Sequence, residues 1–244
     1  MRKLYILILL LVIGAASEAQ PNYWNAQPTG GGNVFPFSTL PITGKKVQWV
    51  ITAAGTSGGF NLPAPVPAGN NITSIWFWTN SAGNATYSNL TIRMANVPTT
   101  QFLSTGAFYT GPMTTVRSQN TSLAPAAAAT WVNIPLTTTF SYNPAMNLII
   151  EVYQCGYTGT GFSIRQQAFG ASPNFRRQWS DGSSICGVTS STTGDLNVAG
   201  IGISVIPAVP CPTPAAQPTG LILTAVSQIQ IDGSFTAAVP PASG

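Results

Sequence analysis

The chain has 244 residues, of which only 6% are charged, and it has a formal net charge of +4 and no histidine. Its few basic residues are scattered instead of forming a stripe, which excludes the phosphate-neutralising surface that nucleic-acid binding needs. The lack of histidine excludes a Ser-His-Asp triad, and so little charge leaves a surface made mainly of Thr, Ser, Asn, Gln and Gly.

Residues 1–19 have the pattern of a signal peptide. Arg2 and Lys3 precede an apolar run from Leu4 to Ile13, and a small-x-small cleavage site follows at residues 17–19. The apolar run is short for a bilayer span, although a retained anchor is the alternative. We expect a mature chain that begins at Gln20, has no membrane span, and is secreted or held on the outer cell surface.

The mature chain has the pattern of many short strands separated by turn residues. We expect a lead-in over 20–32 and an all-β, jelly-roll-like antiparallel sandwich over 33–205. Pro135 marks an edge strand or a strand end, and 126–129 is too short for a stable helix. The expected strands are a short one near 34–37, then 46–53, two runs within 72–97, 113–118, 130–136, 146–153, 162–167, 178–180 and 196–205.

The stretch 72–97 has the pattern of a β-hairpin, because two alternating apolar runs flank a polar loop that contains glycine. The period of two places one set of residues in the core, namely Ile75, Phe77, Leu90, Ile92 and Met94. Trp76, Trp78 and Arg93 would then share the opposite face. A pair of indoles beside a hydrogen-bond donor can stack a sugar ring, so these three residues are the candidate ligand site. The alternatives are that a loop, such as 60–67, covers the rings, or that they contact a neighbouring domain.

Other chemistry is sparse. Residues 55–59 have the spacing of a nucleophile elbow, but three prolines follow where the motif needs a helix. Glu151 is expected to pair with Arg165 on the next strand, and a catalytic pair of Glu151 with Asp181 or Asp195 is the alternative. A structural calcium ion at the loops around these two aspartates is a further alternative. We therefore expect no catalytic residue, no metal site, no cofactor and no enzyme activity.

Three cysteines occur, at positions 155, 186 and 211. In an oxidising compartment, a disulfide between Cys155 and Cys186 is expected, which leaves Cys211 over. Cys211 lies in a Pro-rich linker at 206–218, which should be stiff and extended.

Residues 219–244 begin a second module. The runs 221–226 and 228–235 resemble the first hairpin of a fibronectin type III or immunoglobulin-like domain. Such a domain takes about 100 residues, so we expect this one to be truncated, with further domains in a longer protein.

The sandwich resembles the N-terminal domain of large, secreted, adhesin-like proteins of Bacteroidetes-type bacteria. The resemblance covers about residues 33–205 and depends on three marks: I-T-S-I-W-F at 72–77, Y-S-N-L-T-I-R-M at 87–94, and N-L-I-I-E-V at 147–152 with a cysteine nearby. It implies a cell-surface or released protein, continued by fibronectin-like repeats and a C-terminal signal for type IX secretion.

The sequence leaves three functional hypotheses. The first is a non-catalytic extracellular module for adhesion or glycan binding, whose partners are a glycan or other cell-surface ligand and further domains of the same chain. The second is an accessory domain of a secreted hydrolase, and the third is a structural spacer.

Overall fold

The computed structural model describes residues 20–38, 44–104, 106–171, 174–182, 186, 193–208, 219–227 and 230–236. The expected signal peptide, Cys211 and most of the Pro-rich linker lie outside the described residues. The chain forms two compact units, residues 1–207 and 208–244, which are described separately.

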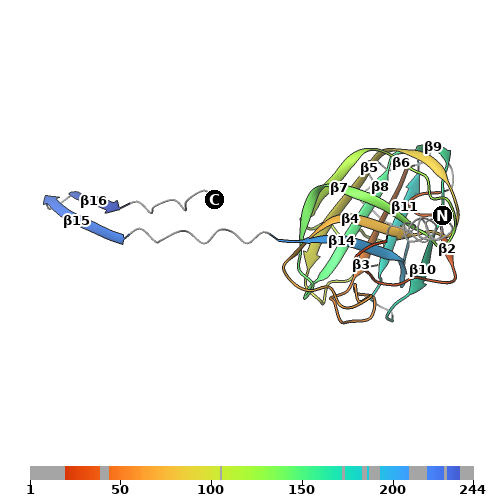
Figure 1. Ribbon diagram of the computed structural model, residues 1–244, viewed down its shortest axis with the longest axis horizontal. Helices are drawn as coiled ribbons and strands as arrows, with labels where there is room; N and C mark the ends of the chain where they lie inside the picture. The colour runs from red at the N-terminus through yellow and green to blue at the C-terminus, as the bar shows by residue number, and fades with distance from the viewer. Residues whose placement is uncertain are drawn as a thin grey trace, which may run out of the picture. The chain divides into compact units, whose positions relative to one another are not determined.

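The larger unit is an antiparallel β-sandwich, as the sequence predicts (Figure 1). One sheet has the order β1 (Tyr23–Trp24), β14 (Ile201–Pro207), β4 (Asn70–Trp78) and β7 (Trp131–Tyr142). The larger sheet has the order β12 (Thr193–Asp195), β11 (Arg177–Gly182), β3 (Gly44–Ile51), β8 (Asn147–Gln154), β5 (Asn84–Val97) and β6 (Thr114–Leu123), with β9 (Tyr157–Thr160) also paired to β5. A small third sheet joins β13 (Asn197–Ala199), β10 (Ile164–Ala168) and β2 (Gly32–Asn33).

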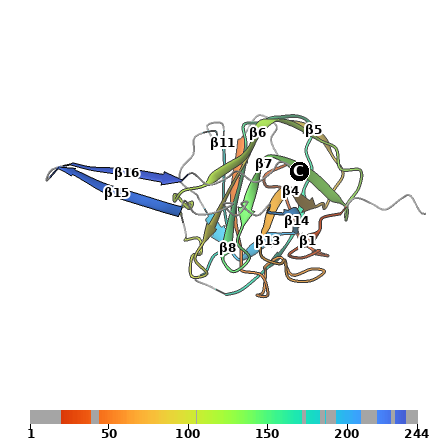
Figure 2. The same cartoon turned by 60° about the vertical axis from the view of Figure 1, so that its left-hand side comes forward.

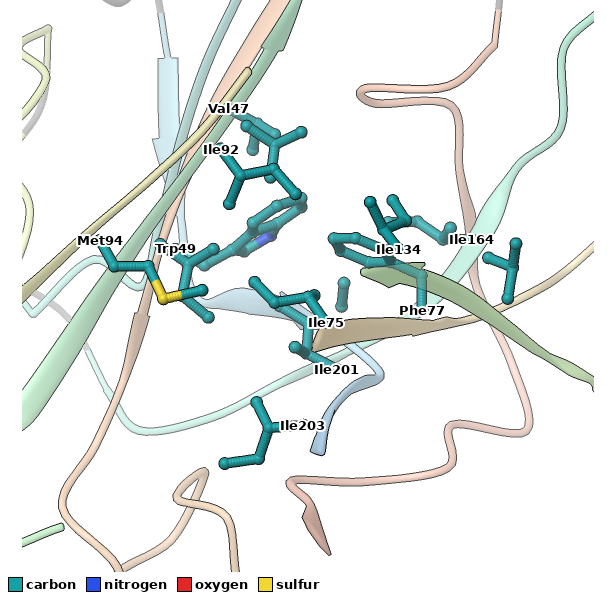
Figure 3. Close-up of a cluster of buried hydrophobic side chains, with 14 of the residues drawn as sticks. Val47, Trp49, Ile75, Phe77, Ile92, Met94, Ile134, Ile164, Ile201 and Ile203 are labelled. Carbon is teal, nitrogen blue, oxygen red and sulfur yellow. The ribbon is translucent and has the colours of Figure 1, made fainter. Parts of the chain in front are cut away.

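Alternate residues of the two main sheets form the core between them. Figure 3 shows Trp49 and Ile92 of the larger sheet facing Ile75 and Phe77 of the four-stranded sheet. All four are at most 1% exposed. The expected inward positions on 72–97 are therefore confirmed, since Leu90, Ile92 and Met94 are also fully buried.

The expected hairpin over 72–97 is wrong. β4 pairs with β14 and β7, whereas β5 pairs with β6, β8 and β9, so the two strands belong to opposite sheets. Their connection bonds to other segments, because Asn80 N donates to Ser163 O and Gly83 N donates to Pro125 O. A connection that crosses from one sheet to the other buries the same alternate residues as a hairpin within one sheet. The alternation alone therefore does not distinguish the two arrangements.

Several smaller expectations are met. β7 is the last strand of its sheet, which agrees with Pro135 as an edge-strand marker, and 126–129 forms no helix. The weak strand expected at 113–118 is β6, which extends to Leu123. The expected lead-in, however, contributes β1 and β2 to the sheets.

The outer face of the larger sheet is covered by residues 98–113. Leu103 from this segment joins a second, smaller core with Val50, Ala95, Val97 and Ile149. Both faces of β3 and β8 are thus buried, which explains the nearly continuous apolar run of residues 148–152.

Cys155 and Cys186 form a disulfide, with their Cα atoms 5.5 Å apart, which confirms the expected pair.

The smaller unit contains an antiparallel pair of strands, β15 (Thr219–Ser227) and β16 (Gln230–Thr236). Two strands were expected there, and their assignment to a fibronectin or immunoglobulin-like domain stays a prediction. No helix among the described residues is long and apolar enough to cross a membrane.

Candidate functional site

Four tryptophans gather on the outer face of the four-stranded sheet, and we call them the tryptophan face: Trp24, Trp76, Trp78 and Trp131. Trp76 and Trp78 lie on this face because they alternate with core residues along β4. Trp24 of β1 lies in the same row as Trp76, with Gly202 of β14 between them. β4 and β14 run side by side in both views (Figures 1 and 2).

Trp131 links the rings of this face. It lies directly opposite Trp78 in the register of β4 and β7, with ring centroids 5.0 Å apart and planes tilted by 56°. Its centroid is 6.3 Å from that of Trp24. Tilted pairs at such distances are favourable aromatic contacts, so the rings hold one another in place.

The N-terminal residues cover part of the tryptophan face. The indole N–H of Trp78 donates to the carbonyl of Pro28 at 3.2 Å. A Cβ at Gly200 would lie 2.7 Å from Trp78 Cβ and 2.8 Å from Pro28 Cδ, so a side chain does not fit there. Trp78 is therefore held between Gly200 and the segment that contains Pro28.

Among the described residues, no hydrogen bond or aromatic ring contact joins the loop 60–67 to Trp76 or Trp78, so the alternative that this loop covers them stays a prediction. Phe60 and Val66 instead pack into the main core, and Phe60 contacts Tyr142 edge-on at 6.0 Å between ring centroids. The main chain of Leu62 bonds to Trp24 of the face, because Leu62 O accepts from Trp24 N at 2.9 Å and Leu62 N donates to Trp24 O at 3.1 Å.

An open hollow lies at the β7 side of the tryptophan face. Its volume is about 460 Å³, within the ~300–1,000 Å³ range of small-molecule sites. Trp131 is half-buried there, Asn133 is exposed, and Trp76 is only 6% exposed. The hollow is lined by Trp76, residues 122–126 and residues 130–133.

Two indole donors of the face have no acceptor among the described residues. The Nε1 atoms of Trp24 and Trp131 are both buried without a hydrogen-bond partner. Trp76 differs, since its Nε1 donates to Ser204 Oγ at 2.8 Å. A buried donor without an acceptor costs about 1–3 kcal/mol.

Arg93 does not belong to this site. It lies on β5 in the larger sheet, where its Nη1 is 2.9 Å from Glu151 Oε1. The structure thus brings Trp76 and Trp78 together with Trp131, and places the third predicted residue in the other sheet. The mistake follows directly from the wrong pairing of β4 with β5.

Glu151 is the centre of a buried polar cluster on the outer face of the larger sheet. It is 1% exposed and contacts Lys46 at 3.0 Å, Arg93 at 2.9 Å and Gln48 at 2.7 Å. The expected partner, Arg165, instead donates to the carbonyls of Pro28 and Thr29, so that pairing is wrong. β8 has β3 and β5 as neighbours, and Arg165 is on neither.

The other two acidic residues of the sandwich each have their own cation. Arg177 forms an ion pair with Asp195, and Lys45 lies 3.6 Å from Asp181. Burial lowers the pKa of Arg177 and of Lys45, and in each case the nearby carboxylate opposes the shift. Among the described residues, no three His, Cys, Asp or Glu side chains form a group that could hold a metal ion.

Sequence reasoning missed two residues of the site, Trp131 and Trp24. Trp131 was within reach, because alternation along the expected strand 130–136 places the apolar Val132 and Ile134 on one face and Trp131 on the other. Trp24 had no such signal, since β1 contains only two residues.

Comparison with protein-family models gives no match, and comparison with curated proteins gives none either.

Proposed function

We propose that this chain is a non-catalytic binding module of a secreted or cell-surface protein, and that the hollow beside Trp131 binds a saccharide. The observation that carries the proposal is the lining of the hollow: a half-buried indole in a mostly apolar wall that also carries two hydroxyl side chains and one amide side chain. Sugars present an apolar C–H face and a rim of hydroxyls, and such a lining complements both.

The extracellular location is supported by two features. Residues 1–19 have the composition of a signal peptide, and Cys155–Cys186 is a disulfide, which persists mainly in oxidising compartments. The resemblance to adhesin-like surface proteins has the same implication.

A glycan array followed by calorimetry tests the proposal with the mature chain. We expect the wild type to bind at least one glycan, and Trp131→Ala to lower its affinity about tenfold, the equivalent of a stacking contact of about 1.4 kcal/mol. Trp179→Ala is the matched control, because Trp179 is also half-buried but lies on β11 in the larger sheet.

A second measurement uses the wild-type chain, so that it does not depend on whether the variant folds. Addition of the bound glycan should shift the NMR signals of Trp131 and leave those of Trp179 in place. A wild type that binds no glycan on the array would sink the proposal and favour the spacer hypothesis.

A further inference from the structure

β7 is an edge strand with an unpaired side. It pairs with β4 on one side, and no described strand pairs with it on the other. Pro135 fits this place, because a proline has no N–H and is tolerated where that group would point away from the sheet.

The register identifies which groups of β7 point outward. Thr79 N donates to Thr130 O at 2.9 Å, so residues 130, 132 and 134 direct their main-chain groups toward β4. Trp78 N instead donates to the carbonyl of Gly200, directly before β14, on the other side of β4. Trp131 and Asn133, opposite Trp78 and Trp76, therefore direct their N–H and C=O groups toward the open edge.

The open part of this edge is short. The next outward carbonyl, that of Pro135, accepts a hydrogen bond from Arg117 Nη1. Further along, Thr137 Oγ1 donates to Val116 O at 2.9 Å. β6 and β7 come together along this side of the sandwich (Figure 2). Within β7, Trp131 and Asn133 are thus the two residues beside the hollow whose main-chain groups point outward.

The hollow has no charged lining. Its polar side chains are those of Ser122, Thr130 and Asn133, and the rest are apolar. Arg117 reaches the same edge but is 7% exposed and donates to Pro135 O and Thr121 Oγ1. A carboxylate or sulfate in the hollow would lose hydration without gaining a counter-charge, which is costly.

From this geometry we infer that the ligand is a neutral sugar, which stacks on Trp131 and binds through its hydroxyls to the main-chain N–H and C=O groups of Trp131 and Asn133. This inference rests on the proposed function and adds the ligand class and the groups that recognise it. An extended peptide could use the same edge, but two outward residues are few for strand addition, which gains its affinity from repeated main-chain bonds.

Two substitutions at one position separate main chain from side chain. Asn133→Ala keeps the N–H, and we expect its affinity for a neutral oligosaccharide to change less than about threefold. Asn133→Pro removes the outward N–H, and we expect a loss of about three- to tenfold, the range of one hydrogen bond. Thermal unfolding checks that both variants fold, and Pro135 shows that β7 accepts proline in this row.

A second measurement uses the wild type alone. Neutral, sialylated and uronic-acid-containing oligosaccharides are titrated into ¹⁵N-labelled protein at low and high salt. We expect the neutral sugars to bind independently of salt and to shift the main-chain amides of Trp131 and Asn133.

Each contrary result has a distinct meaning. Preference for an acidic glycan, weakened by salt, would overturn the neutral class and leave the saccharide function intact. Sugar binding without shifts at Trp131 and Asn133, or an equal loss in Asn133→Ala and Asn133→Pro, would overturn the main-chain contact. Binding of an extended peptide with no glycan binding would overturn the proposed function as well.

Discussion

Glu151 illustrates how one residue can unite three strands from a buried position. Its carboxylate accepts contacts from Lys46 and Gln48 on β3 and from Arg93 on β5, while Glu151 itself is on β8. Gln48 is also tied to the covering segment, because Tyr109 N donates to its Oε1 at 2.7 Å. The cluster thereby fixes both the sheet and the segment above it.

We predict that Glu151→Gln lowers the free energy of unfolding by about 2–4 kcal/mol. Removal of one member of a buried ion pair leaves the partner charges uncompensated, which is expensive. Arg93→Gln is the graded control: the Arg93 side chain is 34% exposed and Lys46 remains in place, so we expect a loss of about 0.5–1 kcal/mol. Urea denaturation measures both, and equal losses would contradict the central role of Glu151.

Lys45 gives a pH-dependent prediction. Its side chain is fully buried, and desolvation lowers its pKa below the ordinary 10.5, although Asp181 opposes the shift. Because the unfolded chain then binds more protons, stability rises with pH between the lowered pKa and 10.5. We expect this rise to disappear in Lys45→Met, as measured by the free energy of unfolding from pH 7 to 10. If the free energy of unfolding rises equally with pH in the wild type and in the variant, groups other than Lys45 cause the rise.

At this scale, the sequence predicts which side of a strand a residue faces better than which partner it meets. The burial of Leu90, Ile92 and Met94 followed from alternation, whereas Arg165 as the partner of Glu151 was wrong. The ion-pair partner of a side chain depends on which strands are neighbours in the sheet, and the local sequence of one strand does not determine its neighbours.

Among the elements, β4 and β5 show the same limit. Each has a clear buried face, and the loop between them has the glycine and asparagine of a turn, yet one strand lies in each sheet. The edge position of β7 could be predicted, because Pro135 has a physical reason to avoid a central strand. β1 could not, since two residues carry no periodicity.

Gly200, between β13 and β14, tests the packing of the N-terminal segment on the tryptophan face. We predict that Gly200→Ala lowers the free energy of unfolding by about 1–3 kcal/mol, because the added methyl group overpacks the contact of Trp78 with Pro28. Gly30→Ala is the matched control, since nothing lies within 4 Å of a Cβ there and its φ is not positive. Thermal unfolding compares the two variants. Equal stabilities would contradict the prediction, because they would show that the segment containing Pro28 moves to accommodate the methyl group at no cost.

For the whole sandwich, the disulfide gives a testable contribution to stability. It joins residues 31 apart in sequence. On the chain-entropy model, closing such a loop stabilises by about 3–4 kcal/mol. We predict that the double variant Cys155→Ser, Cys186→Ser loses about that amount and that a reducing agent lowers the melting temperature of the wild type but not of the variant. Insensitivity of the wild type to reduction would refute this contribution.

The pairing of β1 with β14 also sets the order in which the domain can be completed. Asn25 bonds Ile201 and Asn22 bonds Val205 across 176 and 183 residues of chain, so the earliest strand has its partner in the latest one. Contacts this distant in sequence form slowly, because the chain loses the entropy of closing a long loop before these contacts can stabilise it. A growing chain that has not yet reached Ile203 leaves Tyr23 and Trp24 without their neighbour. The sandwich is therefore incomplete until β14, its last strand, has been synthesised.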